Sequence, residues 1–308
     1  MRRDDTRNGT SILVLTLCVL WGACAAARLP EAVTLPQAHV RPPSHVDQIH
    51  NYEGAVAAIA AVLERELGVA PFPVTFHFYP NAKAFEAALV GFGQDPAMAR
   101  DTAAAMLGVG MHSRVLLNNE SLAHISWPNR VRVLSHELIH SLQYELAGGI
   151  RGTSEQWLRE GFAEWAALMV LDRLRGPSLR GLRDQQLGLL RGSDRSRAPR
   201  LDDMVDFKQW LAVANRRDIA PYSQAFLTVD FLVERHGAPA IVEYFRQFTS
   251  TRNYHLAFRR AFGEERAAFE AAVDERLQLR RDSRAPAMPA PLLTSMSPSR
   301  TSHLNSPW

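Results

Sequence analysis

Two histidines flank a glutamate in the segment His136-Glu137-Leu138-Ile139-His140. Residues four apart lie on one face of a helix, so His136 and His140 could present both imidazoles to a single metal ion. Glu137 lies beside them and could take a proton from a water molecule at that ion. The spacing therefore predicts a metal site with an adjacent base, and Zn²⁺ is the ion that such ligands suit.

A third ligand is expected at Glu160, in the segment Trp157-Leu158-Arg159-Glu160-Gly161-Phe162-Ala163. A catalytic zinc usually has three protein ligands and keeps a fourth position for water. Glu164 follows on the same helix face, where its carboxylate could accept the N–H of a ligand histidine and fix the imidazole tautomer. The alternative for Glu164 is a glutamate that faces solvent.

The two histidines need a helix to position them. Five apolar residues give the surrounding segment a buried face: Val133, Leu134, Leu138, Ile139 and Leu142. Pro128 could open this helix, and Gly148 with Gly149 could end it. The alternative is a buried helix whose two histidines are satisfied without a metal.

Together these segments resemble the gluzincin metallopeptidases, in which a HExxH helix is followed by a second helix that carries a glutamate ligand. The run from Trp157 to Ala163 looks like the W-L-x-E-G-x-A block of the aminopeptidase-like branch, and of uncharacterised secreted bacterial peptidase MA-like domains. The resemblance implies that His136, His140 and Glu160 bind zinc. It also implies that Glu137 is the general base in the hydrolysis of a peptide bond.

Tyr222 is the candidate donor to the oxyanion that forms during such a reaction. It stands at the start of an apolar helix, in the segment Ala220-Pro221-Tyr222-Ser223. Aminopeptidase-like gluzincins resemble this chain in carrying a tyrosine on a later helix. The alternative is a packing residue at a helix start.

The G-x-M-E-N block with which the aminopeptidase branch captures a substrate's amino terminus has no counterpart here. The run Gly108–Asn119 lacks the required glutamate and instead predicts an edge strand, with Val115 and Leu117 alternating. Zincin folds align a substrate backbone along such a strand. An endopeptidase is therefore expected rather than an aminopeptidase.

The order of elements predicts an α+β fold of the zincin-like kind: a small sheet whose edge strand packs on the HExxH helix, then a mainly helical subdomain. Ahead of the edge strand we expect a helix over 46–67, a strand over 74–79 and a helical stretch over 82–107. The metal-bearing helices begin near Pro128 and Ser154. Four further helices are expected, at 222–236, 238–248, 254–262 and 264–281.

One catalytic domain is expected over residues 46–281, after a lead segment over 28–45. The segment from Gly176 to Asp203 is rich in Arg, Ser and Gly and is expected to be a loop over the site or a simple connector. Residues 282–308 are rich in Pro and Ser and are expected to be disordered.

Residues 1–27 have the pattern of a secretory signal peptide, because three arginines precede an apolar core that is followed by small residues. The core is too short to span a bilayer comfortably. Export to the periplasm or the extracellular space is therefore expected. The alternative is a lipoprotein anchored through Cys24, which would be the chain's route to membrane attachment.

The composition limits the classes of partner that the protein could bind. The chain has 35 Lys and Arg against 32 Asp and Glu, a formal charge of +3, which gives no case for nucleic acid as a partner. Both cysteines, Cys18 and Cys24, lie in the signal region, so the mature domain has no disulfide. The expected partner is a peptide or polypeptide substrate. The competing hypothesis is an exported protein that binds metal or substrate without turnover.

Overall fold

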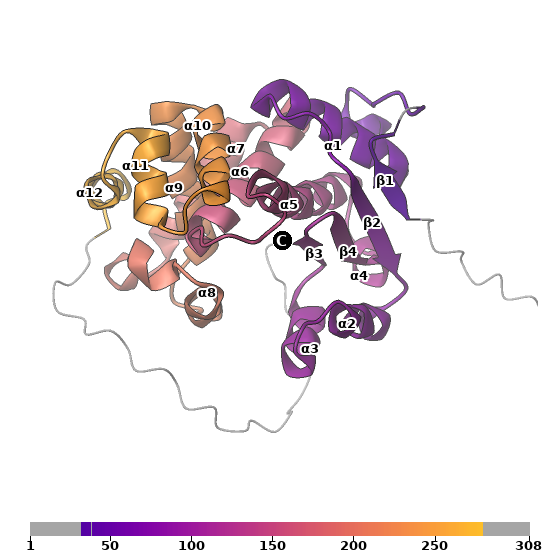
Figure 1. The fold of residues 1–308 in the computed structure, drawn as a ribbon, viewed down its shortest axis with the longest axis horizontal. Helices are drawn as coiled ribbons and strands as arrows, with labels where there is room; N and C mark the ends of the chain where they lie inside the picture. The colour runs from indigo at the N-terminus through magenta and orange to yellow at the C-terminus, as the bar shows by residue number, and fades with distance from the viewer. Residues whose placement is uncertain (1–31, 38, 280–308) are drawn as a thin grey trace, which may run out of the picture.

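The computed structural model of the chain describes residues 32–37 and 39–279. The predicted signal peptide and the predicted disordered tail lie outside these residues. The fold is α+β, as expected: it is mostly helical, with one small mixed sheet of four strands (Figure 1). No helix within the described part of the chain is long and apolar enough to cross a membrane.

The sheet has the strand order β1-β2-β4-β3. Its strands are β1 (Val33–Leu35), β2 (Val74–Tyr79), β3 (Gly108–Met111) and β4 (Arg114–Asn118). The central strands β2 and β4 run parallel, and each outer strand is antiparallel to its neighbour. β2 occupies the predicted range, whereas β1 lies within the lead segment, for which no strand was predicted.

The run Gly108–Asn119 forms two strands, and the prediction of a single edge strand was wrong in this respect. A tight turn at His112 and Ser113 joins β3 to β4, and Ser113 has a φ of 59° that suits a turn. Val115 and Leu117 belong to the inner strand β4, where both are fully buried. The strand at the sheet edge is the short β3, in which glycines alternate with Val109 and Met111.

Helices cover both faces of the sheet. On one face, α1 (Tyr52–Leu67) packs against β1 and against α5, within the main apolar core. On the other, α2 (Ala82–Gly91) and α3 (Pro96–Ala105) enclose a smaller apolar cluster with Leu116 of β4.

Capping residues set the bounds of these helices. The helix predicted from Val46 starts later, because the chain first makes a short 3-10 turn at 46–48 and Asn51 then caps α1. The stretch predicted over 82–107 is divided, because Asp95 caps α3 and so starts a second helix. A short helix, α4 (Asn119–Ala123), follows β4.

The two helices expected to carry the metal site are α5 (Trp127–Leu146) and α6 (Gln156–Arg173), and they pack against each other. Pro128 lies in the first turn of α5, and Gly148 and Gly149, both with positive φ, follow its end. Every residue of α6 from Gln156 to Leu171 is buried. This burial lets α6 hold polar side chains away from solvent.

The C-terminal part is helical, as predicted, and packs on α6 (Figure 1). Its helices are α7 (Leu179–Gly192), α8 (Phe207–Ala214), α9 (Pro221–His236), α10 (Ala238–Arg246), α11 (Tyr254–Phe262) and α12 (Arg266–Leu277). The segment expected as a loop or connector contains α7. Ser178 caps this helix, and Arg183 pairs with the buried Asp230 of α9. These contacts order a segment whose composition suggested a loop.

Gly161 permits the close approach of α9 to α6. A Cβ atom at this position would overlap the carbonyl oxygen of Ala225 and lie 2.7 Å from a methyl group of Val229. Only glycine lets the two backbones come this near. Because Ala225 is three residues after Tyr222, the same contact positions the first turn of α9 relative to Glu160.

Candidate metal centre

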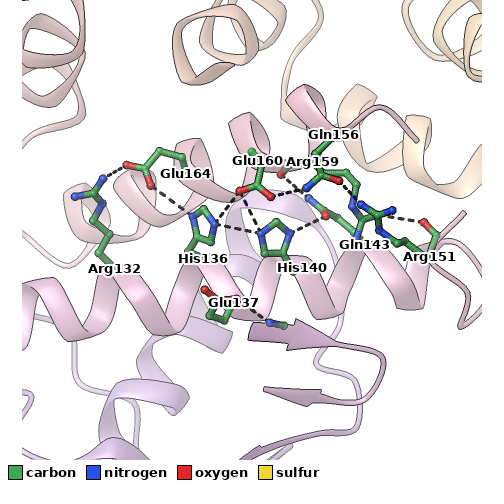
Figure 2. A network of polar contacts seen from close by, with 11 residues as sticks. Arg132, His136, Glu137, His140, Gln143, Arg151, Gln156, Arg159, Glu160 and Glu164 are labelled. Atoms are coloured by element: carbon green, nitrogen blue, oxygen red, sulfur yellow. Dashed lines mark hydrogen bonds and ion pairs between the residues drawn. The ribbon is translucent and has the colours of Figure 1, made fainter. Parts of the chain in front are cut away.

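The three predicted ligands lie together between α5 and α6. The Nε2 atoms of His136 and His140 are 3.1 Å apart. The Oε2 atom of Glu160 lies 3.5 Å from Nε2 of His136 and 3.7 Å from Nε2 of His140 (Figure 2). These three side chains could hold a metal ion.

The side-chain atoms of His136, His140 and Glu160 that face one another favour a bound cation. His140 Nδ1 lies 3.1 Å from the amide oxygen of Gln143, which can only accept, so Nδ1 carries the proton and Nε2 presents a lone pair. His136 Nδ1 lies 3.5 Å from the Glu164 carboxylate, which assigns the same tautomer. With both imidazoles neutral, two lone pairs and a carboxylate oxygen would face one another. A proton on His136 or a metal ion between the three side chains relieves their mutual repulsion.

The electrostatics of the group point the same way. Burial disfavours the charged form of His136, but the carboxylates of Glu160 and Glu164 outweigh it and raise the pKa of His136 to about 10. Burial also opposes the charge of Glu160, yet the two histidines hold the pKa of this carboxyl far below its usual range. The cluster thus stabilises one added positive charge, which a proton or a metal ion can supply.

The Glu137 side chain extends toward the sheet edge and is close enough for its charge to act on His136. Its Oε2 atom accepts the backbone N–H of Gly110 at 2.7 Å. A Cβ atom at position 110 would overlap the carbonyl oxygen of Glu137 and lie 2.7 Å from Cβ of His140. The glycine of β3 therefore lets the edge strand lie against α5 and hold the carboxylate beside the histidines.

Glu164 is buried rather than solvent-facing, and it lies between His136 and Arg132. Burial opposes its charge, but the contacts with His136 and Arg132 lower the pKa of its carboxyl. Glu164 is therefore an anion that accepts from the His136 imidazole. Arg132 balances its charge at the far side, as Figure 2 shows.

Tyr222 lies in the first turn of α9, close enough to the metal-site residues for the charge of Glu160 to shift its pKa. Burial, and then the negative charge of Glu160, raise the pKa of its phenol well above the usual value. Its ring meets the Trp210 ring of α8 edge-on at 4.8 Å. The indole N–H can only donate, so the hydrogen bond between them leaves the phenolic O–H as a donor.

Two glutamines were not predicted as part of the site. Gln143 accepts from His140 and donates to the main-chain oxygen of Arg159 at 2.9 Å, which ties the ligand on α5 to the backbone of α6. Gln156 donates to Oε1 of Glu160 at 2.6 Å. Their spacing was a usable signal, since Gln143 is three residues after one ligand and Gln156 four before another.

Comparisons of the chain with protein-family models, with curated proteins and with solved structures found no match.

Proposed function

We propose that this chain is an exported, zinc-dependent peptidase of the gluzincin type. The observation that carries the proposal is the convergence of two imidazole Nε2 atoms and one carboxylate oxygen, with Glu137 held beside them by Gly110. Two histidines and a carboxylate form a common ligand set of catalytic zinc. The small sheet with β3 at its edge and the helix pair α5 and α6 are what a zincin-like arrangement requires.

The metal fits the residues that would hold it. His136, His140 and Glu160 supply three donors, and Glu164 and Gln143 fix the histidine tautomers that leave both Nε2 atoms available. When bound, zinc would polarise a substrate carbonyl and lower the pKa of a water molecule to about 7.

Glu137 is the residue that moves the proton. Gly110 holds one carboxylate oxygen, Oε2, and the other is the oxygen suited to accept a proton from water as that water attacks the carbonyl carbon. Glu137 then delivers this proton to the amide nitrogen while the C–N bond breaks. The products are one carboxylic acid and one amine, so the reaction consumes a single water molecule.

Tyr222 is the proposed donor to the oxyanion of the tetrahedral intermediate. A phenol whose pKa is raised stays protonated throughout the neutral range, so its O–H can donate without losing its proton. Glu160 contributes to that raised pKa, which links the donor electrostatically to the metal ligand.

The proposed substrate is a peptide bond within a chain. β3 is an outer strand of the sheet, and its Gly110 N–H points toward Glu137 rather than toward β4. An extended peptide lying along this edge would pass the base and the histidines. The G-x-M-E-N block for an amino terminus is absent from the sequence, which favours an endopeptidase.

The test compares the wild-type protein with Glu137→Gln. Both should retain about one zinc per chain after purification. Only the wild type should cleave a mixed peptide library, and a chelator should abolish the cleavage. His136→Ala combined with His140→Ala should lose the zinc, and retention of zinc by that variant would refute the ligand assignment. Zinc binding without chelator-sensitive cleavage of any peptide would favour the non-catalytic binding protein instead.

A further inference from the structure

The two carboxylate oxygens of Glu160 have different partners. Oε2 faces both ligand histidines, whereas Oε1 accepts a hydrogen bond of 2.6 Å from Nε2 of Gln156 (Figure 2). Both residues are buried, with 9% of Glu160 and 3% of Gln156 exposed. Oε1 is therefore occupied by a protein donor and is directed away from the histidine pair.

Gln156 is held in the orientation that this contact needs. It precedes Glu160 by four residues on α6, so the two side chains lie on one face of the helix. Its amide oxygen accepts from the guanidinium of Arg151. Because arginine can only donate, the oxygen must face Arg151 and the NH₂ group must face Glu160.

Arg151 is exposed and lies between α5 and α6. Its carbonyl oxygen accepts from Arg159 at 3.1 Å, which fixes its backbone, and its guanidinium lies 5.9 Å from the ring centroid of Phe207 at the start of α8. A charged donor on the amide oxygen polarises the amide and strengthens the bond that its NH₂ group makes. The interposed amide keeps Arg151 from pairing directly with Glu160, so no guanidinium competes with a cation for this carboxylate.

We propose that Gln156, supported by Arg151, is a positioning residue that restricts Glu160 to binding a divalent cation through one oxygen. A carboxylate that bound through both oxygens would occupy two coordination positions and, with two histidines, fill a four-coordinate ion. Binding through Oε2 alone leaves a position for water or substrate, which a catalytic site needs. This inference rests on the proposed metal site but not on peptide cleavage.

The experiment replaces zinc with Co²⁺, whose visible and magnetic circular dichroism spectra report coordination number. Gln156→Met keeps the chain length of the side chain and removes the N–H donor. Gln186→Met is the matched control, because Gln186 is also a buried amide, bonded to Ser223 on α9 and outside the metal cluster. Azide serves as a probe of the open position, and its dissociation constant is measured for each loaded protein.

In Gln156→Met we expect the added carboxylate oxygen to raise the coordination number by one and azide affinity to fall about tenfold, while Gln186→Met matches the wild type. Gln156→Glu, which can still pair with Arg151 but has no N–H for Glu160, should change both readouts in the same direction. If Gln156→Met does not fold, the Gln156→Glu variant is measured in its place.

An unchanged coordination number with unchanged azide affinity would overturn the proposal. So would loss of the metal from folded Gln156 variants, because Gln156 would then be needed for ligation itself. A wild-type protein that binds one Co²⁺ and azide but cleaves no peptide would contradict the proposed function alone.

Discussion

The backbone N–H of Gly110 donates to the carboxylate of Glu137 across the boundary between the sheet edge and α5, at 2.7 Å. This contact joins a strand to the helix that carries both candidate histidine ligands. It depends on the absence of a side chain at position 110, since a Cβ atom there would overlap the Glu137 carbonyl oxygen. The placement of the base is thus determined by a glycine on another element.

Gly110→Ala should disturb this boundary. Overpacking of this kind destabilises a protein by about 1 to 3 kcal/mol, and the displaced strand should release the Glu137 carboxylate. We expect a lower midpoint in denaturant and a loss of hydrolysis that exceeds any loss of zinc. Gly188→Ala is the control, because no atom lies within 4 Å of a Cβ there and alanine in a helix should stabilise by roughly 0.5 to 1 kcal/mol. Equal effects of the two variants would contradict the interpretation.

Removal of the metal should lower the stability of the protein. A ligand that binds only the folded state stabilises it by about 2.7 kcal/mol when its free concentration is 100 times its dissociation constant. A chelator should therefore lower the melting temperature by several degrees, and added zinc should restore it. His140→Ala should abolish this response. If neither the chelator nor added zinc changes the melting temperature, the cluster binds no metal.

Metal binding should release a proton near neutral pH. The pKa of His136 in the folded, metal-free protein is about 10, above its ordinary value of 6.5, so His136 is protonated at pH 7.5 and must lose that proton to become a ligand. Without metal, the protonated His136 contributes stability that is fully present below pH 6.5 and is lost as the pH rises through about 10.

The zinc affinity should consequently rise with pH until the pH reaches about 10, where His136 loses its proton without metal. Calorimetry of zinc binding at pH 7.5, in two buffers with different ionisation enthalpies, measures the number of protons released. A value near one is expected. A value near zero would show that His136 is already neutral in the metal-free protein.

Tyr222→Phe removes the proposed oxyanion donor and the acceptor of the Trp210 indole N–H, whereas the ring can still pack against Trp210. The loss of one such donor usually lowers kcat by about 100-fold to 1,000-fold. KM and zinc content should change little, and the melting temperature should fall by only about 2 to 4 °C, the effect of losing one hydrogen bond. Unchanged kcat would assign Tyr222 to packing at the start of α9.

Gln143→Leu should weaken metal binding. The side chain must accept from His140 and donate to the Arg159 carbonyl oxygen, and an uncharged amide can do both. Loss of such a partner of a ligand histidine typically lowers metal affinity by about 10-fold to 100-fold. Gln186→Leu should lower stability without this effect. Competition with a chromophoric chelator measures the affinity of each variant.

The donor side chains of the candidate centre could be predicted from the sequence because their grouping depends on local spacing. Residues at i and i+4 lie on the same face of a helix. The sequence therefore predicted that His136 and His140 share one helix face and that Glu160 and Glu164 share another. The α+β class followed from the order of apolar periodicities. The helix over 254–262 was predicted with the bounds that the structure shows.

Contacts between separate segments could not be predicted in this way. Gly110 donates to Glu137, which is 27 residues later in the chain. Helix α9 packs closely on α6 because Gly161 has no side chain at the interface. The segment that contains α7 looked like a loop, because its order depends on Arg183 meeting Asp230, 47 residues away. The sequence alone determined which groups could act on a metal. The tertiary structure decided how their donors converge, because hydrogen bonds and packing between distant segments set those orientations.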